Sequence, residues 1–299
     1  MLWHFRLDHP NFQYLKHLFP SLFNNKDVFQ CDICQFTNNQ RSNYPSQPYK
    51  ASKPFAMIHS DIWGSSCLQS LTGKRWFITF IDDHTCTTWL YLLKEKKCGK
   101  TNIKIFCQMI QNQFNAKIQV LWTDDGGKYF NTILENYLLE KRIMHQSSCV
   151  GIAQQNGVAE WKNRYLLEVA RSIMFTTNVP KQFWGDSILT TCYLINRMPT
   201  RVLNYQTPLK SFLQFYPQTQ SINQFPLKVF GYKAFVHVPD QNWTKLDPRA
   251  LACVFLRYSA TQKGYCCYSL EKRKILCHYG CYFLWERTLF IPKFTSGGE

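Results

Sequence analysis

Three runs of alternating or clustered hydrophobic residues follow one another between residues 55 and 94. They read "FAMIHSDIWG" (55–64), "RWFITFIDD" (75–83) and "TTWLYLLK" (87–94). Short runs rich in β-branched and aromatic residues, separated by brief turn-forming segments, are typical of consecutive strands. The pattern therefore predicts an antiparallel meander of three strands.

The spacing of hydrophobic residues becomes helical after residue 100. In "NIKIFCQMIQNQF" (102–114), Ile103, Phe106, Ile110 and Phe114 would share one helix face. There follow a strand-like "KIQVLW" (117–122), a helix-like "NTILENYLLEKR" (131–142) and a long helical stretch from about residue 155 to 177. Strands, a helix, another strand and more helices predict an α/β domain with a mixed sheet.

The two ends of the chain differ from this middle part. Residues 225–290 hold short hydrophobic runs such as "ALACVFLRYS" and "KGYCCYSL", which predict a small β-barrel or sandwich. Residues 1–45 are short and rich in His, Cys and aromatic residues, and a polar stretch with three prolines follows them as a linker. We expect three domains, over residues 1–45, 55–215 and 225–290.

Charge changes this picture most among the bulk properties. The 299 residues include 35 Lys and Arg against 19 Asp and Glu, a net charge of +16. Such an excess, spread along the chain, is typical of a protein that binds a polyanion, although solubility alone is an alternative. No apolar run is long enough to cross a membrane, and the start of the chain does not resemble a secretion signal. The thirteen scattered cysteines are therefore expected to be mostly reduced core residues of a cytosolic or nuclear protein.

Two histidines and two cysteines near the N-terminus form a candidate zinc site. His4, His9, Cys31 and Cys34 supply the imidazoles and thiolates of a tetrahedral zinc set. On one continuous helix His4 and His9 would point about 140° apart, so the chain should turn near His9 and a second helix should follow. The rival interpretation of "CDIC" as a redox dithiol leaves the histidines unexplained.

Three acids on separate elements form the second candidate site. Asp61 lies inside the first strand, where an unpaired carboxylate is costly. Asp124 ends the strand in "VLWTDDGGKYF", a segment that a simple turn would also explain. The third acid is Glu160 in "QQNGVAEWKNRYLLEVAR". Three such acids in a basic protein are what two-metal phosphoryl transfer requires.

Glu160 has a plainer interpretation as part of a solvated helix face. It shares that face with Arg164, Glu168 and Arg171, which would form ordinary i,i+4 pairs. Lys162 and Asn163, however, fall within the apolar arc of the same helix. We therefore expect the first turns to extend beyond the core, so that Glu160 need not lie in open solvent.

Taken together, these motifs resemble the integrase of copia-type LTR retrotransposons, a member of the retroviral-integrase group. "LWHFRLDHP" with "CDIC" is similar to the family's zinc segment, and "HSDIWG", "TDDGGKYF" and "QQNGVAEWKNRYLLE" are similar to its three catalytic motifs. The 35 residues between Asp124 and Glu160 also match the spacing of this class. The similarity extends over nearly the whole chain and includes the β-rich segment that begins with "KVFGYKAFVHVP".

The resemblance implies a ribonuclease-H-like core between a zinc-binding helical domain and a small β-barrel, in a segment of a Pol polyprotein. Asp61, Asp124 and Glu160 would hold two Mg²⁺ or Mn²⁺ ions for 3′-end processing and strand transfer, and His4, His9, Cys31 and Cys34 a structural Zn²⁺. The partners would be double-stranded DNA, both element ends and target, contacted by Gln155, Lys162 and Arg164, and further copies of the chain. It would act in the nucleus at the integration step and lie in the cytoplasm before that.

Several residues depart from the family pattern. Asp125 stands where Asn is usual, Lys128 replaces a usual acid, Trp161 a basic residue and Arg257 a glycine. These changes are also expected of a degenerate element copy. A catalytically silent, zinc-stabilised DNA-binding remnant is therefore an alternative, and a metal-dependent nuclease with the same core is a third.

Overall fold

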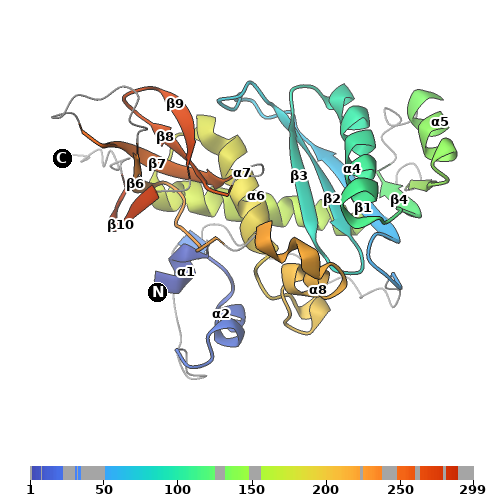
Figure 1. Cartoon of the computed structure of the whole chain (residues 1–299), viewed down its shortest axis with the longest axis horizontal. Coiled ribbons are helices and arrows are strands. Elements are labelled where there is room, and N and C mark those ends of the chain that lie inside the picture. The colour runs from blue at the N-terminus through green and yellow to red at the C-terminus, as the bar shows by residue number, and fades with distance from the viewer. Residues whose placement is uncertain are drawn as a thin grey trace, which may run out of the picture.

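The fold consists of a central mixed sheet, a second sheet and two short N-terminal helices (Figure 1). It is seen in a computed structural model that describes residues 2–7, 9–22, 31, 33–34, 51–124, 132–147, 156–222, 225–237, 248–259, 263–278 and 281–288. The N-terminal helices are α1 (Leu2–Arg6) and α2 (Phe12–Leu18). None of the described helices is long and apolar enough to span a membrane.

The central sheet has the strand order β3-β2-β1-β4-β5. Its strands are β1 (Met57–Trp63), β2 (Trp76–Asp82), β3 (Thr88–Leu93), β4 (Val120–Thr123) and β5 (Met144–Ser147). The first three form the predicted antiparallel meander, and β4 and β5 are parallel to β1. This mixed sheet is the one that the sequence pattern predicts, and its arrangement is the ribonuclease-H-like core that the family resemblance implies.

Helices cover both faces of this sheet because both faces are apolar. One face packs against α4 (Gly99–Phe114) and α5 (Thr132–Glu140), with Ile58, Phe80, Phe106 and Leu138 in one buried cluster. The other face, which includes Phe77, packs against α6 (Gly157–Thr177) and α7 (Trp184–Ile195). Neighbouring residues of a strand point to opposite faces, so Phe77 and Ile78 serve different layers.

The second sheet is antiparallel, with the order β10-β6-β7-β8-β9. It comprises β6 (Tyr232–His237), β7 (Ala250–Tyr258), β8 (Tyr265–Ser269), β9 (Lys274–His278) and β10 (Cys281–Thr288). In a flat sheet β6 and β9 would lie about 14 Å apart. Their Cα atoms instead approach within 8 Å, so the sheet curls as the predicted small barrel requires.

Helix α6 links the two sheets. One face of α6 packs on the central sheet through Leu166 and Ala170. A neighbouring face, toward the end of the helix, packs Val169 and Ile173 against Val254 and Leu256 of β7 (Figure 1). One continuous helix therefore carries Glu160 near one end and contacts the curled sheet with the other.

The remaining helical segments join these parts. They are η1 (Lys96–Cys98), η3 (Lys181–Phe183), η4 (Arg201–Leu203), α8 (Pro208–Phe215) and η5 (Pro217–Ile222). The structure also joins Cys266 to Cys277 by a disulfide between β8 and β9, a pair that the sequence analysis does not predict. The other ten cysteines within the described ranges are not disulfide-bonded.

Candidate functional site

Asp61 and Asp124 lie on neighbouring parallel strands. Ser60 of β1 is in register with Thr123 of β4, so the residue after each reaches the same level of the sheet. Asp61 is still within β1, whereas Asp124 directly follows β4. Adjacent strands are about 4.8 Å apart, so the pairing alone brings the two acids together.

Helix α6 is fixed to β1 beside these acids by Asn163. The Asn163 side chain is only 3% exposed. Its Nδ2 donates to Asp61 Oδ2 at 2.9 Å, and its Oδ1 accepts from Thr79 Oγ1 at 2.9 Å. Asn156, just before α6, adds a bond from Nδ2 to the Ser60 carbonyl at 3.3 Å. The start of α6, with Glu160 on it, is thus held against the strand that carries Asp61.

The three carboxylates repel one another. Burial raises the pKa of Asp61, the charge of Asp124 raises it further, and the hydrogen bond from Asn163 opposes the rise. The pKa of Glu160 is also raised, first by burial and then by the charges of Asp61 and Asp124, while Arg164 lowers it. Repulsion of this kind is what bound cations relieve. A divalent metal site is therefore chemically reasonable here.

Lys96 places a positive charge near the acids, and no sequence pattern predicts that it lies there. Its charge lowers the pKa of Asp61, and its Nζ lies 5.9 Å from the ring centre of Trp76. Its only sequence signal is its place in the short basic run "KEKK" (94–97).

The predicted DNA contacts differ in their surroundings. Arg164 is exposed, whereas Lys162 is half-buried with its Nζ 5.7 Å from the ring centre of Trp161. Burial lowers the pKa of Lys162. The other candidate, Gln155, lies outside the described residues, as do Asp125 and Lys128.

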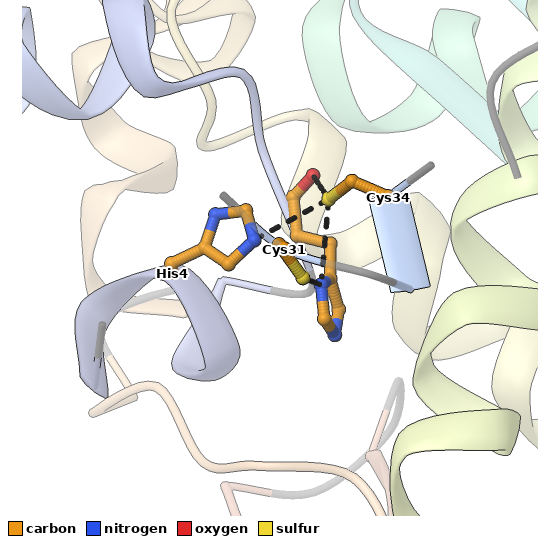
Figure 2. A group of neighbouring side chains, drawn as sticks. His4, Cys31 and Cys34 are labelled. Carbon is orange, nitrogen blue, oxygen red and sulfur yellow. Dashed lines mark hydrogen bonds between the residues drawn. The ribbon is translucent and has the colours of Figure 1, made fainter. Parts of the chain in front are cut away.

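The four candidate zinc ligands come together at the N-terminus (Figure 2). Cys31 Sγ lies 3.2 Å from His9 Nδ1, and Cys34 Sγ lies 3.6 Å from the same nitrogen and 3.4 Å from His4 Nε2. In a tetrahedral zinc site a nitrogen and a sulfur ligand are about 3.6 Å apart. Each of the four residues offers one nitrogen or sulfur ligand atom, and these four atoms all lie within 4.8 Å of one another.

The local chain path explains how residues 4 and 9 meet. His9 has a φ of 61°, and its N–H donates to the His4 carbonyl at 2.8 Å. A second helix then begins at Phe12, with the Asn11 side chain accepting from the Gln13 N–H as its N-cap. The predicted turn near His9 and the helix after it are confirmed.

The protonation states suit a metal. Burial lowers the pKa of both His4 and His9 to about 4, so both rings are neutral near pH 7 and keep a lone pair for a cation. Burial and the nearby Cys31 raise the pKa of the Cys34 thiol to about 12. A zinc ion would reverse that rise by stabilising the thiolates.

Three parts of the chain match known families. Residues 1–38 match the GAG-pre-integrase domain, residues 51–152 the integrase core domain and residues 232–286 the retroviral polymerase SH3-like domain. The integrase core match includes Asp61 and Asp124 and ends before Glu160.

The chain is also similar to long polyproteins. It is 32% identical over 279 residues to the retrovirus-related Pol polyprotein from transposon TNT 1-94 of Nicotiana tabacum, covering 92% of this chain and 21% of that protein. It is 32% identical over 270 residues to the Pol polyprotein from transposon RE2 of Arabidopsis thaliana, covering 89% and 18%. The chain thus spans about a fifth of the length of these relatives.

Among solved structures, it resembles the HTLV-2 integrase catalytic core domain in complex with magnesium (trimeric form). The TM-score is 0.41 at 13% identity, over 54% of this chain and 98% of that one.

Proposed function

Since this chain belongs to the integrase segments of retrotransposon Pol polyproteins, we propose that it catalyses 3′-end processing of element DNA and its strand transfer into target DNA. The observation that carries the proposal is the placement of the acids. Asp61 and Asp124 occupy the same level of two paired strands, and Asn163 fastens the helix that carries Glu160 to Asp61. The electrostatic effect of Asp61 and Asp124 on Glu160 supports a shared site.

In this proposal the three acids hold two Mg²⁺ or Mn²⁺ ions. When bound, such a pair supplies charge stabilisation for the attacking and leaving oxygens of a phosphodiester. The role of Asn163 is to keep Asp61 in one orientation, because its amide is itself fixed by Thr79. Lys96 and Arg164 place positive charge near the carboxylates, which favours the approach of a phosphate backbone.

Double-stranded DNA, from the element ends and from the target, is the proposed substrate. The net charge of +16 supports a polyanionic partner, and exposed Arg164 is the best placed of the three predicted contacts. We further propose a homo-oligomer that acts in the nucleus at the integration step. A structural zinc at His4, His9, Cys31 and Cys34 is also proposed, supported by the nitrogen and sulfur distances.

A strand-transfer assay with Mg²⁺ tests the function. Short duplexes that mimic element ends are incubated with a target plasmid, and joined products are compared for the wild type and Asp124→Asn. We expect joining with the wild type and none with the variant. Absence of joined product from both proteins, with DNA binding retained, would instead support the catalytically silent remnant.

One observation favours the alternative of a catalytically silent DNA-binding remnant. Trp161, which is 56% exposed beside Glu160, occupies a place where the family usually has a basic residue. A nuclease with the same core is the third outcome of the assay. It would cut the duplex with Mg²⁺ without joining it to the target.

A further inference from the structure

The N-terminal segment is packed against the core by contacts on several sides. Leu7 and Leu15 share a buried cluster with Met198. Arg201 donates to Gln13 Oε1 at 2.7 Å, and the rings of His17 and Tyr205 stack at 3.8 Å. These contacts surround α1 and α2, but none of them touches a candidate zinc ligand.

One contact does join the ligand set to the core. His9 Nε2 lies 2.7 Å from Oγ1 of Thr176, in the last turn of α6. The same hydroxyl donates to the Ser172 carbonyl at 2.7 Å. A threonine hydroxyl has a single proton, and a carbonyl accepts only. Because that proton is directed to Ser172, Thr176 Oγ1 accepts from His9, and His9 carries its proton on Nε2.

This assignment fixes the chemistry of the other nitrogen. With its proton on Nε2, the neutral His9 ring presents the lone pair of Nδ1. That nitrogen is the one that faces Cys31 Sγ at 3.2 Å and Cys34 Sγ at 3.6 Å. Thr176 thus selects the tautomer that binds a metal among these sulfurs.

We infer that Thr176 is an outer-sphere partner of the zinc site, so that zinc fastens the N-terminal segment to α6 of the catalytic core. The inference rests on the proposed zinc site. Outer-sphere partners of ligating histidines hold the ring in place and raise metal affinity. Because α6 is continuous from Gly157 to Thr177, the helix fixed by zinc at one end is the one that carries Glu160 at the other.

The test uses the full chain and two substitutions at one position. Thr176→Val removes the acceptor and keeps the shape, whereas Thr176→Ser keeps the hydroxyl. Zinc affinity is measured by competition with a chromogenic chelator. We expect affinity about 10- to 100-fold weaker in Thr176→Val and close to wild type in Thr176→Ser. Arg201→Ala, which removes a contact remote from the ligands, should bind zinc as the wild type does.

Hydrogen exchange of the wild type gives a second readout that needs no variant. Removal of zinc with a chelator should increase exchange both in α1–α2 and in the last turns of α6. Wild-type zinc affinity in Thr176→Val, or faster exchange in α1–α2 without any change in α6, would overturn the inference. Absence of zinc binding by the wild type would contradict the zinc site itself, which is a different result.

Discussion

Asn163 Nδ2 donates to Asp61 Oδ2 at 2.9 Å, which ties the second turn of α6 to the middle of β1. The bond is shielded from solvent because Asn163 is almost fully buried. Thr79, which is in register with Asp61 on the next strand, holds the other end of the same amide. One asparagine therefore sets the orientation of Asp61 and the position of the helix that carries Glu160.

Loss of this asparagine should impair metal use more than folding. In Asn163→Ala the Asp61 carboxylate loses its fixed donor, so we expect strand transfer to fall at least about tenfold, an effect typical of supporting residues around metal ligands. The Mg²⁺ concentration for half-maximal rate should rise at the same time. Rates over a Mg²⁺ series measure both.

Asn102→Ala is a matched control for that experiment. Asn102 also donates from Nδ2, to the Cys98 carbonyl at 2.9 Å, but it lies on α4 on the other face of the sheet. Its loss should leave the Mg²⁺ dependence unchanged. Equal effects of the two substitutions would contradict a positioning role for Asn163.

Without metal, Asp61 should destabilise the fold at neutral pH. Its pKa is raised in the folded state, so its ionised form is disfavoured there, and stability is lost as the pH rises through that pKa. Asp61→Asn should therefore raise the unfolding temperature in EDTA by a few degrees, roughly 2–4 °C per kcal/mol for a chain of this size. The gain should shrink toward zero below about pH 3, where the aspartate is protonated in both states, because an unfolded aspartate has a pKa of about 3.9.

Thermal unfolding at pH 7 and at about pH 3 measures this difference. Glu140→Gln, at an exposed carboxylate, should show no such change. A gain from Asp61→Asn that stays constant over this pH range would show that its cause is not the charge.

The ion pair between Arg257 and Asp186 should stabilise the junction of the two sheets. Arg257 of β7 donates from Nε to Oδ1 of buried Asp186 on α7 at 3.0 Å. The glycine usual at this place in the family is not required here, because Arg257 is not among the residues with positive φ. Arg257→Gly would leave a buried carboxylate without its partner, and we expect a loss of about 1–3 kcal/mol.

Urea unfolding of the two proteins measures that loss. Glu95→Gln breaks the exposed pair with Lys97 at 2.7 Å and should have no measurable effect. If Arg257→Gly were as stable as the wild type, the ion pair would contribute nothing.

Metal analysis should find about one zinc per chain. Cys31→Ser removes a buried ligand and should abolish the zinc, whereas Cys67→Ser, at an exposed cysteine outside the cluster, should keep it. Retention of full zinc by Cys31→Ser would exclude the proposed ligand set.

The sequence predicts the elements that have strong periodicity and misses those that depend on tertiary contacts. The helix over Ile103, Phe106 and Ile110 is confirmed, with all three side chains fully buried. The strand β5 is not predicted, since "MHQS" is short and half polar and is held by its pairing with β4. Val158, in the first turn of α6, is 45% exposed, which its apolar side chain does not predict.

The same limit applies to the sites. Spacing and residue type indicate the acids and the zinc ligands, because those properties are local. The position of Asn163 in an apolar arc is a sequence signal, and the structure gives its reason as the bond to Asp61. No sequence signal indicates Thr176, because its contact is with His9, which lies 167 residues earlier in the chain.

Trp161 gives a final test of DNA binding near the acids. It stacks on Tyr165 with ring centres 5.4 Å apart and remains largely exposed next to Glu160. Trp161→Arg would place a cation where the family usually has one, so we expect tighter DNA binding and a salt dependence steeper by about 0.9 in log–log slope, as for one added phosphate contact. Affinities at several salt concentrations measure the slope. Leu139→Arg adds the same charge at an exposed position of α5, on the opposite face of the central sheet. If both variants steepened the slope equally, the gain would come from net charge, and the DNA would not lie along the start of α6.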